Sequence, residues 1–226
     1  MNNLRLFWYD SETTGLNEKD HQMLSFAMVS TDINLNILSK FETKLRLLPH
    51  VMPDPQALKT NNIDPTSLDW FSSSKEENES INEFVNFYDS QKSDYNYWLA
   101  FNAPFDNKFL FYALIRNSLL INLDNATCVD PLILAKEGTS KNILSTVQKK
   151  SKDGRFYRSS TLQDVASLLG TKNEGDAHNA MNDVLTMLKT TPKMVEKVLN
   201  QDMLSFLNNP KYHTEKDKFK NLVVKP

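Results

Sequence analysis

Two acidic residues, Asp10 and Glu12, stand one residue apart at the end of an apolar, aromatic run near the start of the chain. Phe7, Trp8 and Tyr9 favour an extended strand, in which successive side chains point to opposite faces. The two carboxylates therefore lie on the same face and repel each other. Oxygen ligands of this kind suit a magnesium or manganese ion. Taken alone, the pair is equally consistent with a strand that ends in a solvated acidic turn.

The Thr-Thr-Gly sequence at 13–15 follows the acidic pair directly. It offers two hydroxyl groups, backbone N–H groups and, in Gly15, a residue that tolerates a positive φ. We therefore expect a negatively charged substrate to approach the backbone at this turn.

Further candidate residues stand where strands and helices are expected to meet. Asp106 follows the buried run 97–101 within the sequence Asn-Ala-Pro-Phe-Asp, and His178 and Asp183 lie where another helix opens. Open α/β sheets place their sites at such junctions. Singly, each residue is a weak signal, because an acid or a histidine at a helix start is commonly a cap or a surface residue. Asp130, which precedes a proline, is expected to be a helix cap rather than a ligand.

Composition limits the class of protein. A chain of 226 residues with 40% hydrophobic residues can bury a substantial core, and we expect one domain. Its single cysteine, Cys128, excludes an intramolecular disulfide framework and a cysteine-based zinc cluster. We find no apolar stretch of membrane-spanning length and no signal core, so we expect a cytoplasmic protein with no membrane partner. The formal net charge of -2 argues against a protein that coats nucleic acid by bulk charge, although a local basic groove remains compatible with it.

Hydrophobic patterning predicts strands and helices that would position these residues. After the first strand, which ends in the acidic pair, the expected strands are 24–31, 37–47, 97–101 and 126–129. The expected helices in the first half are 56–61, within a proline-rich loop, 79–90, after a polar linker at 72–78, and 104–114. Those in the second half are 161–169, a helix that opens near 180 and is broken by Pro192, and 194–207, which precedes a basic tail. The first three strands should form an antiparallel meander.

A basic, irregular segment at 141–158 carries two aromatic residues, Phe156 and Tyr157. Its basic residues greatly outnumber its acids, with Lys141, Lys149, Lys150, Lys152, Arg155 and Arg158 against Asp153. Such a segment can grip phosphates and stack bases. A solvated hairpin that turns at Asp153-Gly154 explains the same residues equally well, and the sequence leaves both interpretations open.

Together, the scattered acids resemble a known family. Asp10-x-Glu12, Asp106 within Asn-x-x-Phe-Asp, and His178 separated by four residues from Asp183 follow the order of the three motifs of the DEDDh 3′-to-5′ exonucleases. Further segments resemble the nuclease domain of the exonuclease I branch, namely 31–37, 52–57, 63–65 and 177–183, with a continuation near 204–220. Exonuclease I has additional domains that complete a DNA clamp. For the nuclease domain alone we therefore expect a distributive enzyme.

The resemblance implies an α/β, ribonuclease H-like fold, with a mixed five-stranded sheet and helices on both faces. Residues 1–190 would form the exonuclease domain, and residues 191–226 a C-terminal helix and basic tail packed on it or trailing from it. The strands expected from the sequence agree with this fold. Three antiparallel strands would be followed by two parallel ones.

The resemblance also implies roles for the acidic residues. Asp10, Glu12, Asp106 and Asp183 would hold two Mg²⁺ ions, for which Mn²⁺ can substitute, and His178 would be the general base. In a continuous helix, a five-residue separation would place His178 and Asp183 about 140° apart. We therefore expect His178 to lie before the helix or in its first turn.

Four residues are expected to contact the substrate. Leu16 matches a family position that wedges against the terminal base, and Phe105 lies beside the third acid of the motif. Simple core packing remains the alternative for both. Thr13 and Asn102 complete the expected substrate-binding set. Ser11 departs from the family, in which a bulkier residue is usual, and we expect its side chain to point away from the metals.

The hypothesis that follows is a magnesium-dependent exonuclease that removes nucleotides from the 3′ end of single-stranded DNA. An RNA-trimming enzyme of the same superfamily is the nearest alternative, because the metal motifs do not distinguish the two sugars. A non-catalytic nucleic-acid-binding module is an alternative of another class. The expected partner is single-stranded nucleic acid, with DNA preferred to RNA.

Overall fold

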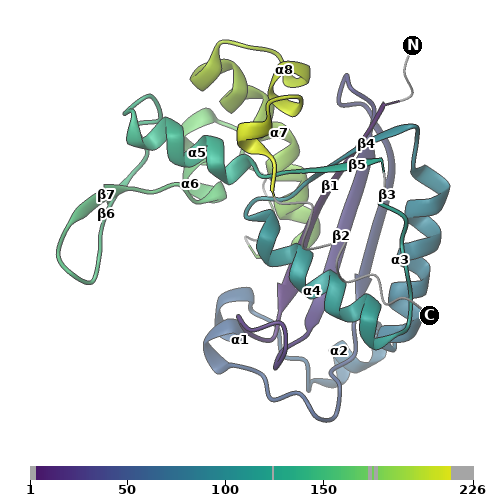
Figure 1. Cartoon of the computed structure of the whole chain (residues 1–226). Coiled ribbons are helices and arrows are strands. Elements are labelled where there is room, and N and C mark those ends of the chain that lie inside the picture. Colours follow the sequence, from purple (N-terminus) through teal and green to yellow (C-terminus); the bar gives the residue numbers. More distant parts are fainter. Residues whose placement is uncertain (1–3, 124, 173–174, 176–177, 215–226) are drawn as a thin grey trace.

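The computed structural model describes residues 4–123, 125–172, 175 and 178–214 (Figure 1). A five-stranded sheet forms its centre, in the order β3-β2-β1-β4-β5. The strands are β1 (Leu4–Thr13), β2 (Met23–Thr31), β3 (Ile37–Lys44), β4 (Tyr95–Leu99) and β5 (Ala126–Val129). β1, β2 and β3 pair antiparallel, whereas β4 and β5 run parallel to β1. This is the mixed sheet that the sequence predicted.

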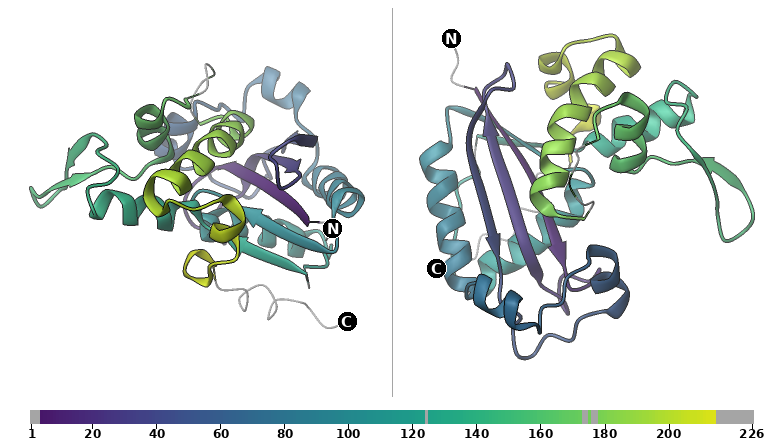
Figure 2. Two further views of the ribbon diagram at one scale, coloured as in Figure 1. Left: turned by 90° about the horizontal axis from the view of Figure 1, so that it is seen from above. Right: turned by 180° about the vertical axis from the view of Figure 1, so that it is seen from behind.

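Helices cover both faces of the sheet, as expected (Figure 2). The helices are α1 (Pro55–Asn61), α2 (Leu68–Ser73), α3 (Glu77–Gln91), α4 (Ala103–Arg116), α5 (Pro131–Ser140), α6 (Leu162–Leu169), α7 (Ala180–Leu199), α8 (Met203–Leu207) and the short η1 (Pro210–Tyr212). One apolar core joins the sheet to α3 and α4, and a second joins its other face to α5, α6, α7 and α8.

The side chains of β1 alternate between these two cores. Leu6 and Trp8 lie in the core on the α7 side, whereas Phe7 and Tyr9 lie among the aromatic rings on the α3 and α4 side. All four are fully buried, which fixes the register of the strand because a shift of one residue would exchange its two faces. The same alternation continues into the acidic pair and directs both acids to the α7 side.

The predicted break at Pro192 is wrong, because α7 runs continuously through this residue to Leu199. An internal proline costs about 3 kcal/mol in helix stability. Packing offsets this cost, since the inward face of α7 is buried on both sides of the proline, at Val184 and Met187 and again at Met194. The helix ends instead at Leu199. The next residue, Asn200, adopts the left-handed conformation with φ 53°, and its backbone N–H donates to the Glu196 carbonyl.

The predicted polar linker at 72–78 is also partly wrong, because α2 occupies its beginning and α3 starts at Glu77. The Glu77 carboxylate is buried and accepts two hydrogen bonds from Arg116 of α4, at 3.1 Å from Nε and 2.6 Å from Nη2. A pattern of apolar residues does not reveal this contact, because both partners are charged. The pairing allows a charged residue to begin a packed helix.

The basic segment forms a two-stranded hairpin, β6 (Gln148–Lys150) and β7 (Phe156–Arg158), which projects away from the sheet (Figure 1). Gly154 adopts a φ of 87° in its turn, a conformation that side chains rarely tolerate. The hairpin turn expected at Asp153-Gly154 is therefore confirmed.

The predicted division at residue 190 falls within α7, and it stays a prediction. Beyond α7, α8 and η1 continue the chain as far as the described residues extend. Most of the expected basic tail, residues 215–226, lies outside them. Among the described residues, we find no helix with the length and apolar character needed to cross a membrane.

Candidate active site

The fold brings the four acids of the sequence motifs to one place, and we call Asp10, Glu12, Asp106 and Asp183 the carboxylate cluster. Asp10 and Glu12 come from the end of β1, Asp106 from the first turn of α4, and Asp183 from the first turn of α7. Their charges act on one another, since Asp106, Glu12 and Asp183 all raise the pKa of Asp10. Three segments far apart in sequence therefore meet in one acidic site.

Asp106 is held in place by the strand that carries the first two acids. Its Oδ1 accepts hydrogen bonds from the Ser11 backbone N–H at 2.9 Å and from the Ser11 hydroxyl at 2.6 Å. The next residue, Asn107, accepts a hydrogen bond from the buried Tyr9 hydroxyl. These contacts fix the first turn of α4 against β1.

The turn before α4 depends on a strained residue. Asn102 adopts the left-handed conformation with φ 79°, which asparagine tolerates better than most residues. Its backbone N–H donates to Asp130 Oδ1 at 3.0 Å, and the same oxygen accepts from Leu132 N at 2.9 Å. Asp130 therefore caps α5 and also fixes the approach to α4. Its predicted role as a helix cap is confirmed.

His178 lies just before α7, at the position that the helical geometry predicted. Its backbone has a φ of 63°, and its N–H donates to Asp183 Oδ2 at 3.2 Å. Asn179 caps the helix by accepting a hydrogen bond from Asn182 N at 3.1 Å. One ligand atom each from Glu12, His178 and Asp183 lies within 4.8 Å of the others. The imidazole therefore reaches the acidic site without belonging to the helix.

Burial and mutual repulsion disfavour the ionised forms of the clustered acids. Burial is the largest cause for each, and it raises the pKa of Glu12 to about 8 and that of Asp106 to about 7. The charges of Asp183 and Asp106 add to the effect at Glu12. Burial also raises the pKa of Asp183, although the charge of His178 opposes this increase.

The donor set of the cluster fits divalent metal ions. Within the described residues, no lysine or arginine forms an ion pair with any of its four members. Buried carboxylates without a cation are costly, and oxygen-only ligands are what magnesium and manganese prefer. The raised pKa values reflect the free-energy cost of keeping the ionised carboxylates close together, and a bound cation would remove this cost.

The predicted substrate-binding residues differ in exposure. Leu16 is 77% exposed, so core packing does not explain it. Phe105 is partly buried and its ring lies 5.0 Å from that of Phe109, which supports the packing alternative. Thr13 is buried, and its hydroxyl donates to the Gly15 carbonyl at 2.7 Å. Asn102 is exposed. The roles of all four in substrate binding stay predictions.

Gly15 is required for a reason other than the expected positive φ. Gly15 does not have a positive φ; among the described residues, the glycines that do are Gly154 and Gly170. A Cβ atom at position 15 would instead stand 2.4 Å from the imidazole of His21. The turn after the acidic pair therefore needs glycine to let His21 approach.

The sequence did not reveal the contacts of two residues at the site. The Ser11 side chain was expected to point away from the metals, which stays a prediction; its hydroxyl donates to Asp106, because α4 packs on the face of β1 opposite to α7. Gln163 of α6 donates from Nε2 to Asp183 Oδ1 at 2.5 Å. No motif includes Gln163. Only the packing of α6 against α7 brings it to the acid.

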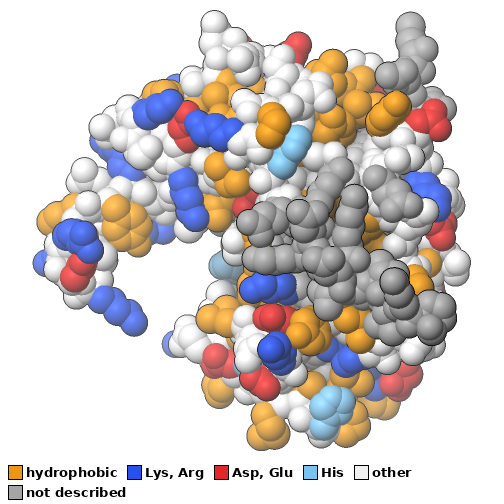
Figure 3. All heavy atoms as spheres, in the orientation of Figure 1, with side chains coloured by type: hydrophobic (Ala, Val, Ile, Leu, Met, Phe, Trp, Pro, Cys, Tyr) orange, Lys and Arg blue, Asp and Glu red, His pale blue; other side chains and the backbone are white. Residues whose placement is uncertain are grey.

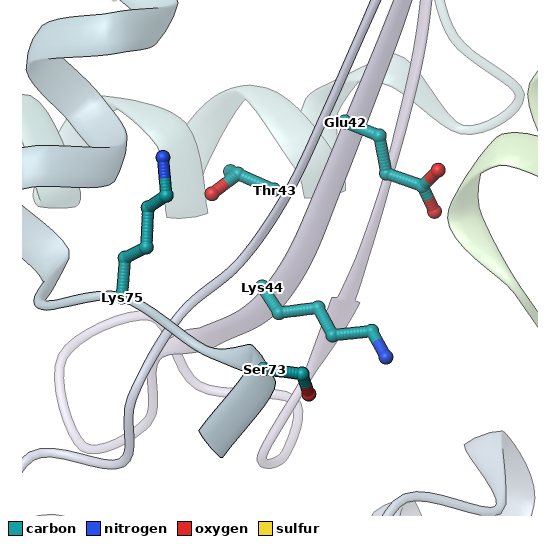
Figure 4. A pocket seen from close by; sticks show the side chains of 5 residues that line it. All are labelled: Glu42, Thr43, Lys44, Ser73 and Lys75. Atoms are coloured by element: carbon teal, nitrogen blue, oxygen red, sulfur yellow. The ribbon is translucent and has the colours of Figure 1, made fainter. Parts of the chain in front are cut away.

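A shallow pocket of about 260 Å³ lies elsewhere, on the edge strand β3 (Figure 4). It is lined by Glu42, Thr43, Lys44, Ser73 and Lys75. Glu42 and Lys44 point to one side of the strand and Thr43 to the other (Figure 4). No member of the carboxylate cluster lines this pocket.

Known nucleases match this chain in sequence pattern and in fold. The family model RNase_T, described as an exonuclease, matches residues 7–191. Exonuclease I from Methylocaldum szegediense superimposes with a TM-score of 0.71 at 20% identity, over 88% of this chain and 41% of that chain. E. coli exonuclease I in complex with a dT13 oligonucleotide gives a TM-score of 0.71 at 18% identity, over 88% and 42%.

A product-bound structure of exonuclease I gives a TM-score of 0.73 at 18% identity and covers 97% of this chain and 48% of that chain. At such identities the likeness shows the fold. This chain spans less than half the length of the three exonuclease I chains. No curated protein sequence matches it significantly.

Proposed function

The chain belongs to the RNase_T exonuclease family, and from this premise we propose that it is a metal-dependent exonuclease that hydrolyses single-stranded DNA from its 3′ end. The products would be nucleoside monophosphates. The observation that carries the proposal is the convergence of four carboxylates from β1, α4 and α7, two of them buried and two partly buried, beside the imidazole of His178.

The carboxylate cluster would hold the metal. Asp10, Glu12, Asp106 and Asp183 supply oxygen ligands for two Mg²⁺ ions, or for Mn²⁺ in their place. Bound ions of this kind make water a better nucleophile and stabilise the leaving oxygen of a phosphodiester. The hydrogen bonds from Ser11 to Asp106 and from Gln163 to Asp183 each occupy one carboxylate oxygen and orient the other. Both oxygens of Asp183 accept a hydrogen bond, because the His178 N–H also donates to Oδ2 at 3.2 Å, but each carboxylate oxygen has a second lone pair for a ligand.

His178 would act as the general base. It accepts a proton from the attacking water, whose oxygen forms a bond to phosphorus while the 3′ oxygen of the preceding nucleotide leaves. That oxygen takes up a proton and becomes the new 3′ end of the shortened strand. The imidazole is exposed and lies outside the helix, which leaves it free to receive and release the proton. Histidine is the side chain most often used as a general base near neutral pH.

The choice of single-stranded DNA is supported by the likeness to exonuclease I, a relative whose structure holds a dT13 oligonucleotide. The test is to digest matched 5′-labelled DNA and RNA oligomers with Mg²⁺, with Mn²⁺ and with a chelator, and to resolve product lengths. We expect DNA to be shortened from its 3′ end, with mononucleotides released, only when a metal is present.

Three results would contradict the proposal in different ways. A strong preference for the RNA oligomer would replace the substrate by RNA. Binding of single strands without release of mononucleotides, with either metal, would indicate a non-catalytic binding module. Internal cleavage products would exclude an exonuclease. An oligomer with a blocked 3′ end serves as the control, and its digestion should stop.

A further inference from the structure

We propose that the β6–β7 hairpin is an arm that binds the single strand on the 5′ side of the cleaved bond. This inference rests on the proposed function and names a second contact surface for the same substrate. The arm comprises residues 147–158. It projects from the body of the protein in every view, and in Figure 3 basic side chains gather on it across a hollow from the α1 side of the molecule (Figures 1, 2 and 3).

The arm carries positive charge that the protein itself does not neutralise. It contains five lysine or arginine residues and one acid, Asp153. Asp153 pairs with Arg155 at 2.5 Å, and Lys149 pairs with Asp164 of α6 at 2.5 Å. Lys150, Lys152 and Arg158 have no carboxylate partner among the described residues. Cations without a carboxylate partner on a projecting hairpin attract the phosphates of a nucleic acid.

The arm also exposes aromatic rings beside these cations. Phe156 is 70% exposed and Tyr157 is 50% exposed. Lys150 and Phe156 are directly opposite each other in the antiparallel pair, and Lys150 Nζ lies 5.8 Å from the centre of the Phe156 ring. An exposed ring offers a base a stacking surface, and the neighbouring ammonium group can reach the adjoining phosphate. This combination suits a single strand, whose bases are accessible.

The base of the arm is firmly held. Ser159 N donates to the Val147 carbonyl at 3.0 Å, and Thr146 Oγ1 donates to the Ser159 carbonyl at 2.6 Å. Arg158 donates to the Thr146 carbonyl at 2.9 Å and to Asn142 Oδ1 at 3.1 Å. A fixed hairpin loses little conformational entropy when it binds, so its contacts contribute more to affinity.

The arm connects directly to the carboxylate cluster through the first turn of α6. Lys149 of the arm binds Asp164, and Gln163, the preceding residue, donates to Asp183 of the cluster at 2.5 Å. Asp164 also accepts hydrogen bonds from Ser159 at 2.5 Å and from Thr161 at 2.7 Å. A strand whose 3′ end lies in the cluster can therefore reach the arm along the first turn of α6.

The double variant Lys150→Ala/Phe156→Ala tests the proposal against a matched control, Lys92→Ala/Tyr95→Ala. The control also removes one lysine and one exposed aromatic ring, since Tyr95 is 54% exposed. Tyr95 pairs with Leu4 at the start of β1, so it lies at the opposite end of the strand from the acidic pair.

Binding is measured by fluorescence anisotropy with labelled oligothymidylates of increasing length, in a chelator so that no hydrolysis occurs. The arm variant should bind long strands roughly tenfold more weakly, because one stacked base and one phosphate contact are lost. The slope of log affinity against log salt should fall by about 0.7. The control variant should bind as the wild type does, and dinucleotides should be cleaved at equal rates by all three proteins.

Equal affinities of the arm and control variants for long strands would overturn the proposal and leave the proposed function intact. A wild type that cleaves no strand would refute the proposed function itself. Lys152→Glu, a change at an exposed turn residue, provides a second variant that leaves the strand pairing of the hairpin unaltered. It should weaken binding in the same direction, and unchanged binding would again count against the arm.

Discussion

Two glutamates of this protein, Glu12 and Glu137, lie in opposite electrostatic environments. Glu137 of α5 accepts hydrogen bonds from Lys141 at 2.5 Å, from Lys211 at 2.6 Å and from the Tyr212 hydroxyl at 2.8 Å. These donors lower its pKa to about 2. Glu12 lies among other acids, and its pKa is raised to about 8, chiefly by burial.

Glu137 has a structural role, whereas Glu12 belongs to the proposed metal site. The contacts of Glu137 attach η1 to α5, and they need no partner from outside the chain. Around Glu12 the fold supplies other carboxylates instead of cations. We propose that a bound ion supplies the balancing charge, and we expect changes at the two glutamates to affect different properties of the protein.

The largest effect is expected for Asp183→Asn, which removes one charge of the cluster and preserves the shape of the side chain. Metal ions contribute several kcal/mol to phosphodiester hydrolysis, so turnover should fall roughly 10³- to 10⁵-fold. Circular dichroism should show a retained fold. Glu137→Gln is the matched control, and it should keep its turnover. Near-normal rates in Asp183→Asn would remove this residue from the metal site.

His178→Ala should lower turnover by about 10²- to 10⁴-fold, the usual contribution of a general base. The carboxylate cluster remains intact in this variant, so we expect Mg²⁺ to raise the melting temperatures of the variant and of the wild type equally. Rates measured across neutral pH provide the check. If the variant retained the wild-type rate throughout this range, His178 would have no part in the proton transfer.

Ser11→Ala should have an intermediate effect, because it removes one of the two hydrogen bonds that Ser11 donates to Asp106. The backbone N–H still holds the carboxylate. We expect about a tenfold increase in the Mg²⁺ concentration needed for half-maximal activity, since a hydrogen bond to a charged group contributes about 1.5–3 kcal/mol. Ser11→Thr keeps the hydroxyl and should restore the wild-type requirement. An equal loss in both variants would indicate a packing defect instead.

The smallest expected effect is the change in folding stability of the metal-free protein with pH. The pKa of Glu12 rises from 4.5 to about 8 on folding, so the folded state retains a proton that the unfolded state releases. This stabilising contribution is complete below pH 4.5 and is lost as the pH rises through 8. Glu137 behaves oppositely, and its contribution is lost as the pH falls towards 2.

Thermal melts of the chelator-treated protein between pH 6 and pH 9 measure this contribution. We expect the melting temperature to fall by a few degrees, at about 2–4 °C for each kcal/mol, and Mg²⁺ to reverse the fall. Glu12→Gln should reduce the pH dependence and leave the part that Asp106, with its pKa raised to about 7, contributes, whereas Glu137→Gln should leave it unchanged. A melting temperature that rises between these pH values would contradict the assigned pKa shift.

The sequence by itself determined the sheet, the acidic motifs and the position of His178. These features depend on local patterns. The alternation of apolar residues fixed which face of β1 carries Asp10 and Glu12, and helical geometry required His178 to precede α7. The resemblance of the motifs to the DEDDh exonucleases then identified the family, which the match over residues 7–191 confirms. The individual roles of the site residues stay predictions.

Tertiary structure alone decided the contacts that join distant segments. The path of α7 through Pro192 depends on what its inward face buries, and the start of α3 depends on the pairing of Glu77 with Arg116. The hydrogen bonds from Ser11 to Asp106 and from Gln163 to Asp183 depend on helix placement in the same way. The periodicity of the sequence predicts which residues share a face of a helix or strand. It does not predict the energies of contacts between residues that are far apart in the chain.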